Sequence, residues 1–410
     1  MPPSRPRLGL GSAAIGAEEE SLVLEVLRQR TLFRYYGDDP ARSPAMVATL
    51  EAEFRRWIGT DYALAVSNGT TALEIVLGAW GVGPGDEVIV PAWSWLSCFT
   101  SVVRVGARPV LAEIDASLCL DPAEIARLTT PRTRAVLVVH FQGVAAAMDR
   151  IQHEAHRRGL FVLEDVAEAP GATFRGRRLG TWGDAAIYSF QHNKPMTAGE
   201  GGMIVTRDLR TYQRAVRLSD LGQYRPHHQS VTPSTEPMMI GGNARMSELT
   251  AAVALAQLRK VDAIRDHCRA LKQQLLAAVG ELSGLTWRPQ ADPAGDSAFE
   301  LYAYLPTAAV ADAFRDALNQ RNINCNPRTG TYPQYHRDYV KTGLTHHPAA
   351  SPFRALQPWP APGYRPEDFP VTEDLIHRMI ALPIGWLYTP ADIDHMAATL
   401  RDLHGELALG

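Results

Sequence analysis

The chain has 410 residues, more than one hydrophobic core usually serves, so we expect two domains. Apolar residues make up 46% of the sequence and charged residues 21%, which is ordinary for a globular protein. The formal net charge of -3 offers no basic surface for nucleic acid, although a local site can still attract a small anion.

The N-terminal third begins with residues 1–17, which we interpret as a flexible N-terminal arm. Apolar residues then recur at helical spacing over residues 18–30, after an acidic first turn, and over residues 43–59, after Ser43 and a proline. Both patterns predict helices that precede the first strand.

Short runs rich in Val and Ile follow, and they alternate with helical patterns such as residues 70–81 and 147–159. We expect strands within residues 62–69, 86–95, 108–115, 134–143, 160–172, 184–190 and 201–208. This alternation is typical of an α/β domain whose mostly parallel sheet is buried between helices.

A long helix is predicted over residues 246–279, and the chain beyond it alternates strands and helices more loosely. We place a domain boundary near residue 260, which gives a large α/β domain over residues 18–260 and a small C-terminal domain over 261–410.

Four scattered cysteines, Cys98, Cys119, Cys268 and Cys325, form no C-x-x-C pair, so we expect no metal site and a reducing cytoplasm. The N-terminus lacks the apolar core of a signal peptide, and no apolar run approaches ~20 residues, so no membrane span is expected.

Lys194 is one of only four lysines among 41 basic residues, and it follows the predicted strand "AIYSF" directly before a glycine-rich turn. Open α/β sheets bind their ligands beyond the carboxyl ends of the strands. A lysine held there suits a Schiff base with pyridoxal 5'-phosphate (PLP). The alternative is a solvated surface lysine.

Asp165 ends another apolar run, in "VLEDVAEAPG". A carboxylate beside the pyridine nitrogen of PLP would keep that nitrogen protonated through pairing of opposite charges. The alternative is an ordinary acid at a strand end that caps the next turn.

The segment "AVSNGTTALEIVLGAWG" has the order strand, turn and helix N-terminus, which makes an anion site from exposed N–H groups. Gly69 and Thr70 would bind the PLP phosphate there, with Ser189 adding a hydroxyl. The alternative is a simple helix cap by Ser67, Asn68 or Thr70.

Two tryptophans follow a strand and a proline in "VIVPAWSWLS". Either Trp93 or Trp95 could stack on the cofactor ring, while core packing is the alternative for each.

Several motifs occur in one order: "SNGTTAL", "GDEVIVPAWSW", "LEDVAEAPGA", "GTWGDAAIYSFQHNKPMTAGEGG" and "GGNARMSELTAAVALAQL". Together they resemble the DegT/StrS-type sugar aminotransferases, a fold-type I PLP group, from about Glu18 to "FPVTEDLIHRMIALPIGW". The resemblance implies Lys194 as the Schiff-base lysine, Asp165 as the pyridine partner and Trp95 as the stacking ring. It also implies Gly69, Thr70 and Ser189 at the phosphate.

Asn243, in "GGNAR", resembles the asparagine that such enzymes send to the phosphate of a neighbouring subunit, which implies a homodimer with a shared active site. Glu168 departs from the family, which usually carries Gln or His three residues after the pyridine aspartate. A carboxylate facing the cofactor's phenolic oxygen is repulsive unless one group is protonated. Glu168 therefore binds a proton, points elsewhere or alters the pKa of the imine.

The resemblance implies transamination of a keto or aldehyde sugar, sugar acid or cyclitol, with glutamate or glutamine as amino donor. Three segments, "TLFRYYGDDP", "AEIDASLCLDP" and "DPAGDSAFELYAYLP", are most similar to transaminases of the 8-amino-octulosonate type. Arg34, Arg245 and Arg328 are candidates for binding an anionic acceptor or donor carboxylate, with structural salt bridges as the alternative.

Two rival functions stay open at this point. PLP-dependent sugar dehydratases of this family replace the lysine with histidine, so Lys194 argues against that activity. A cofactor-free scaffold on the same fold would be expected to lose Lys194 or Asp165, and both are present.

Overall fold

The computed structural model describes residues 10–36, 45–325, 332–355 and 364–406. Its centre is a seven-stranded sheet in the order β1-β10-β9-β6-β5-β2-β4. The strands are β1 (Tyr62–Val66), β2 (Glu87–Pro91), β4 (Arg108–Ala112), β5 (Thr133–Val139), β6 (Phe161–Asp165), β9 (Ala185–Ser189) and β10 (Gly202–Thr206). Strand β10 pairs antiparallel with both neighbours, and the other pairings are parallel. The predicted α/β fold with a mostly parallel sheet is therefore confirmed.

Helices cover this sheet because its strands are apolar on both faces, and β2 is buried at every residue. The chain steps across the sheet in one direction from β1 to β4 and then returns through β5 and β6. Right-handed crossovers therefore put the connecting helices of the two halves on opposite faces. The helices of the first part are α1 (Ala17–Gln29), α2 (Met46–Ile58), α3 (Gly69–Ala79), α4 (Ser97–Arg104), α5 (Pro122–Leu128), α6 (Met148–His156), α7 (Leu209–Ser219) and α8 (Pro226–Val231).

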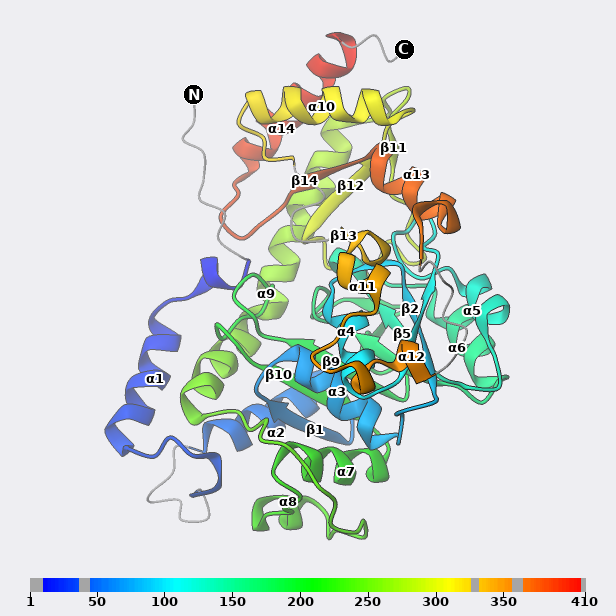
Figure 1. Ribbon diagram of the computed structural model, residues 1–410. Coiled ribbons are helices and arrows are strands. Elements are labelled where there is room, and N and C mark those ends of the chain that lie inside the picture. The colour runs from blue at the N-terminus through cyan, green and yellow to red at the C-terminus, as the bar shows by residue number, and fades with distance from the viewer. Residues whose placement is uncertain (1–9, 37–44, 326–331, 356–363, 407–410) are drawn as a thin grey trace.

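The predicted long helix is a single element, α9 (Glu248–Val279), which begins with Ser247 accepting a hydrogen bond from the Thr250 N–H. Figure 1 shows it running from the seven-stranded sheet to a smaller one. Residues up to Val261 join the core of the large sheet, whereas Ile264 and those after it join a second core. The division into domains at residue 260 itself stays a prediction.

The second core lies around a three-stranded antiparallel sheet. Its strands are β11 (Thr286–Trp287), β12 (Glu300–Tyr304) and β14 (Met379–Pro383). The helices after α9 are α10 (Ala308–Gln320), α11 (Asp338–Thr342), α12 (Pro352–Ala355), α13 (Pro370–Arg378) and α14 (Pro390–Glu406). Two short pairs complete the fold: β3 (Trp93–Ser94) with β13 (Tyr332–Pro333), and β7 (Thr173–Phe174) with β8 (Arg177–Arg178).

The described part of the predicted N-terminal arm is packed against the large domain. The Gly11 N–H donates to the Lys194 carbonyl at 3.2 Å. A Cβ atom added at Gly11 would lie 2.9 Å from that carbonyl oxygen and 2.8 Å from the Gln257 side chain. Glycine at this position therefore allows the arm to approach the loop that carries Lys194.

Within the described residues, none of the helices combines the length and apolarity that crossing a membrane requires.

Candidate active site

A cavity of about 600 Å³ opens at the carboxyl ends of the parallel strands; we call it the edge cavity. Its walls come from the loops that follow β1, β2, β5, β6 and β9, where an open α/β sheet binds ligands. The lining residues are Leu10, Asn68, Gly69, Thr70, Leu73, Trp95, Ser97, Val139, Gln142, Asp165, Ala167, Glu168, Ile187, Ser189, Gln191, Asn193, Lys194, Pro195 and Glu200. Seven predicted site residues, scattered over 126 positions of the chain from Gly69 to Lys194, thus meet in one place.

The Lys194 side chain lines this cavity. Nζ lies 3.0 Å from Oε1 of Glu168 and 5.8 Å from the centre of the Trp95 ring. Burial lowers the pKa of the Lys194 amine, but the charge and hydrogen bond of Glu168 raise it further, so the net shift is upward. The lysine is therefore an ammonium held by a carboxylate.

Asp165 lies at the end of β6, and its carboxylate is 5% exposed. One oxygen accepts the Ala167 N–H at 3.0 Å, and the other lies 3.4 Å from the Cys98 sulfur. Burial raises the pKa of Asp165 and outweighs the Ala167 N–H, the Lys194 charge and the Cys98 thiol, which lower it. Both of these donors are uncharged, so the carboxylate can still gain a cationic partner from the cavity.

The neighbouring acid, Glu164, has a different surrounding although it precedes Asp165 directly. Successive side chains of a strand point to opposite faces of the sheet. Glu164 is fully buried and accepts hydrogen bonds from Gly180 N–H at 2.8 Å and Gly183 N–H at 2.6 Å, and from the His140 ring at 2.9 Å. His140 is also buried. Glu164 therefore has a structural role, because its hydrogen bonds connect β6 to the loops that contain His140, Gly180 and Gly183.

The N-terminus of α3 forms another wall of the edge cavity. The Asn68 side chain caps this helix by accepting the Thr71 N–H at 2.8 Å. A Cβ atom added at Gly69 would lie 2.8 Å from the Ser189 Cβ, and one at Gly202 would lie 2.7 Å from the Asn68 backbone. Two glycines therefore allow α3 to begin against β9 and β10, with the Ser189 side chain beside its first turn. The helix cap by Asn68 is observed, while the anion site at this N-terminus stays a prediction.

The two tryptophans after β2 separate into different environments. Trp93 is 1% exposed and packs against Phe141 with ring centres 4.4 Å apart, whereas Trp95 is 44% exposed and lines the edge cavity. Because strand residues alternate in direction, residues two apart could have pointed to the same side. The chain leaves β3 after Ser94 and turns towards α4, which sends Trp95 to the cavity instead.

Glu168 points at Lys194 rather than away from the cavity. Its second oxygen accepts the Gln142 N–H at 3.4 Å. Gln142 has φ 46° and ψ 53°, a left-handed conformation that is uncommon for a residue other than glycine. Gln142 and Cys98 were not identified from the sequence, because neither contact has a local signal; both arise where loops from different strands meet.

The predicted substrate-binding arginines lie outside the lining of the edge cavity. Arg34 is buried and donates to Glu51 Oε1 at 2.7 Å. Burial raises the pKa of Glu51, but Arg34 and His227 lower it to about 2. Arg245 forms an ion pair with Asp220. Both arginines thus have structural salt bridges, and Arg328 lies outside the described residues.

Asn243 is also absent from the lining of the edge cavity. Its side chain is exposed, and its backbone forms an isolated bridge with Asp220. In the described part of one chain, its amide group therefore does not reach the cavity that holds the Lys194 ammonium.

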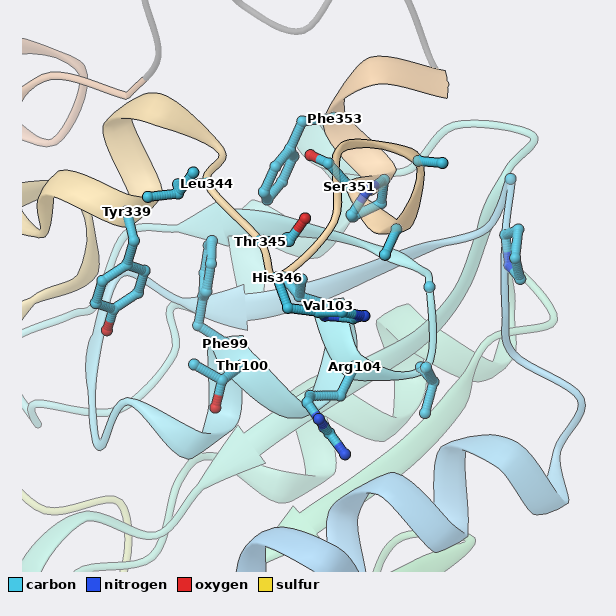
Figure 2. Close-up of a pocket in the computed structure, with 17 residues that line it drawn as sticks. Phe99, Thr100, Val103, Arg104, Tyr339, Leu344, Thr345, His346, Ser351 and Phe353 are labelled. Carbon is cyan, nitrogen blue, oxygen red and sulfur yellow. The ribbon is translucent and has the colours of Figure 1, made fainter. Parts of the chain in front are cut away.

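A second cavity of about 410 Å³ lies beside α4, and we call it the α4 cavity. Figure 2 shows Phe99, Val103 and Phe353 among the side chains around it. It contains none of the predicted site residues, and Arg104 on its wall has its Nε 3.2 Å from Glu74. Searching the described residues for clusters of His, Cys, Asp and Glu finds no group suited to a metal ion.

Comparisons with known proteins agree on one class. The sequence model of the DegT/DnrJ/EryC1/StrS aminotransferase family matches residues 15–401. A GDP-perosamine synthase from Caulobacter vibrioides is 33% identical over 401 residues, covering 96% of this chain and 98% of that protein. An L-glutamine:2-deoxy-scyllo-inosose aminotransferase from Streptoalloteichus tenebrarius is 33% identical over 380 residues, covering 87% and 86%.

Solved structures with a similar fold are also aminotransferases. The aminotransferase TlmJ from Streptoalloteichus hindustanus superimposes with a TM-score of 0.78 at 26% identity, covering 96% of this chain and 98% of that one.

Proposed function

This chain belongs to the DegT/DnrJ/EryC1/StrS aminotransferase family and is an aminotransferase, and from that premise we propose how its edge cavity works. It transfers an amino group from an amino acid to a keto or aldehyde carbon of a sugar, sugar acid or cyclitol. The names of the relatives, a perosamine synthase and an inosose aminotransferase that uses glutamine, support this acceptor class and glutamine as donor. An acceptor of the 8-amino-octulosonate type remains a narrower prediction.

The cofactor of this proposal is PLP, and the chemistry of the cavity fits it. The buried carboxylate of Asp165 has only uncharged hydrogen-bond donors and suits a cationic ring nitrogen. The α3 N-terminus, where a Cβ at Gly69 would meet Ser189, suits a phosphate. The exposed face of Trp95 suits a flat ring.

The charges of the cavity lining support the same cofactor. It contains three carboxylates, Asp165, Glu168 and Glu200, but a single cation, Lys194, among the described residues. Glu168 already pairs with that lysine at 3.0 Å. Asp165 is therefore the buried acid that gains most from a cationic ring, and this unmatched carboxylate in the same cavity as Lys194 is the observation that carries the proposal.

When bound, PLP supplies an electron-withdrawing ring and an aldehyde that condenses with amines. Lys194 would hold the bound cofactor in the resting enzyme, and its Nζ, once free and neutral, would accept a proton from the carbon next to the transferred nitrogen and return it. Asp165 keeps the ring cationic, and Thr70, Gly69 and Ser189 bind the phosphate. Trp95 holds the ring from one face.

The proposed enzyme is a homodimer in which Asn243 reaches the phosphate of the neighbouring subunit. Support comes from the exposure of Asn243 and of two apolar side chains on the same segment, Met238 at 70% and Ile240 at 98%. Mixing K194A with N243A subunits would then restore activity, because each hybrid dimer contains one intact site. No restoration in mixed subunits would rule out the shared site.

A cytoplasmic location also remains part of the proposal. All four cysteines are buried free thiols, which supports a reducing compartment.

The test of the function begins with the purified protein and added PLP. We expect a yellow protein, and borohydride treatment followed by peptide mass spectrometry should find the cofactor on Lys194. Adding glutamine or glutamate should bleach the colour, and a matching keto sugar or keto cyclitol should restore it. A protein that stays colourless with excess PLP, or carries it on another lysine, would overturn the proposal.

A further inference from the structure

The contact between Glu168 and Lys194 is unusual for a lysine that must act as a nucleophile. Nζ and Oε1 are 3.0 Å apart, and the two side chains are only 15% and 13% exposed. An amine attacks an aldehyde only when it is neutral, and a nearby carboxylate favours the ammonium form instead. The pair therefore opposes the first event that the proposed function requires.

Glu168 is held in this position through its second carboxylate oxygen. Its Oε2 accepts the Gln142 N–H at 3.4 Å, and Gln142 has a left-handed backbone. The next residue, Gly143, has φ 84°, and a Cβ there would lie 2.6 Å from Ser297 Oγ. The backbone of Ser297 also donates to the Gly143 carbonyl at 3.1 Å. The loop after β5 is thus fixed by the chain beyond α9, and strained loops that persist often serve a site.

The other titratable groups around Glu168 cannot replace the lysine as its partner. Asp165 is a second carboxylate, while the Cys98 thiol and the Tyr302 hydroxyl are uncharged groups close enough for Glu168 to raise their pKa values. Among the described residues that line the cavity, Lys194 is the only cation. The charge of Glu168 is therefore balanced by Lys194 or by nothing in this cavity.

We propose that Glu168 is the counter-ion that holds the free amine of Lys194 as an ammonium, so that the lysine becomes a nucleophile only when this proton leaves to solvent. In the capture of an aldehyde, the ammonium loses its proton to water, the neutral amine forms the new carbon–nitrogen bond, and the carbonyl oxygen departs as water. Glu168 delays this capture to higher pH. When the donor amino acid later frees Lys194 as a neutral amine, Nζ can accept a proton from the substrate carbon, and the same carboxylate then stabilises the resulting ammonium until it returns that proton.

This inference rests on the proposed function only in making Lys194 the residue that captures PLP. Its test can therefore use the full chain stripped of cofactor by hydroxylamine. The reactivity of Lys194 towards acetic anhydride is measured between pH 6 and 11 by mass spectrometry of its peptide. Lys341, whose side chain is 45% exposed, is the internal reference.

In Glu168→Gln we expect the midpoint of the Lys194 labelling curve to fall by about one pH unit, which is about tenfold faster labelling at a fixed pH below the midpoint. Glu168→Asp keeps the charge and should keep most of the upward shift. Glu200→Gln is the matched control, because Glu200 lines the same cavity whereas Lys194 pairs with Glu168, and its midpoint should equal that of the wild type.

An unchanged midpoint in Glu168→Gln, or an equal fall in Glu200→Gln, would overturn the proposal. If Glu168→Gln does not fold, as judged by thermal melting, Glu168→Asp decides: a midpoint as low as that of an ordinary lysine contradicts a charge effect. Failure of the proposed function would look different, since PLP would then not be found on Lys194 whatever the labelling curve shows.

Discussion

The edge cavity and the α4 cavity lie on either side of one helix but differ in the chemistry of their walls. The N-terminal residues of α4, Ser97 and Cys98, reach the edge cavity or its buried acid. Further along the helix, Phe99, Thr100, Val103 and Arg104 line the α4 cavity. The edge cavity contains a half-buried lysine that pairs with Glu168 and is also influenced by the charge of the buried Asp165. The α4 cavity is lined mainly by aromatic and aliphatic side chains, and Arg104 on its wall already has a partner.

The volume of a cavity therefore does not show whether it is a catalytic site; the charge and burial of its lining side chains are more informative. Burial of charge costs free energy, so a buried acid such as Asp165 beside a half-buried ion pair persists only if something compensates for it. An apolar hollow costs mainly lost packing. The edge cavity, whose partly buried charges cost free energy, is therefore the better candidate for the active site. The following four substitutions test this comparison with the α4 cavity.

The largest effect should come from Lys194→Ala. Because this removes the only amine of the edge cavity that can hold a cofactor and move a proton, we expect transamination to fall by about 10³-fold or more. The measurement is kcat with a responsive donor and acceptor. Lys341→Ala removes an exposed lysine elsewhere and should leave the rate unchanged; equal loss in both variants would contradict the assignment.

Asp165→Asn should lower activity by about 10²-fold or more while stabilising the cofactor-free protein at neutral pH. Burial raises the Asp165 pKa above its ordinary value of 3.8. Protonated Asp165 therefore favours the folded state: its contribution to the free energy of unfolding is fully present below pH 3.8 and is lost as the pH rises through the raised pKa.

The check is chemical unfolding of cofactor-free wild type and Asp165→Asn at pH 3.5 and pH 7. The variant should gain stability relative to the wild type as the pH rises. A wild type that gains on the variant between these pH values would show that the carboxylate is stabilised, not strained, by its surroundings.

Gly69→Ala should weaken cofactor binding about tenfold, a smaller effect. The new methyl would lie 2.8 Å from the Ser189 Cβ and would push the α3 N-terminus away from β9. The dissociation constant of PLP, measured by fluorescence quenching, tests this. Gly405→Ala in α14, where nothing lies within 4 Å of the added atom, is the control, and an equal loss there would exclude a local cause.

The smallest effect is expected in the α4 cavity. Leu344 lines it and is 75% exposed, so Leu344→Ser should change the free energy of unfolding by no more than about 0.5 kcal/mol. Its kcat should stay within twofold of the wild type. A large loss of activity would mean that the two cavities are coupled through α4, and the comparison above would have to be abandoned.

Much of the fold could be predicted because its signals are local. The strands β1, β2, β4, β5, β6, β9 and β10 all lie within short apolar runs that are visible in the sequence, and α9 begins within two residues of its predicted start. Lys194 and Asp165 were also found locally, since each follows or ends such a run. Cys98 and Gln142 could not be found, because their contacts with Asp165 and Glu168 join loops from different strands.

The sequence by itself determined the alternation of strands and helices and the residue types at the strand ends, because apolar spacing and turn residues act over a few positions. Only the tertiary structure decided which of two adjacent acids faces the cavity, that Trp95 rather than Trp93 lines it, and that Arg34 is bound to Glu51. It also decided that Glu168 meets Lys194. These outcomes depend on the directions in which separate loops leave a shared sheet edge, and such directions are set by packing between segments far apart in the chain.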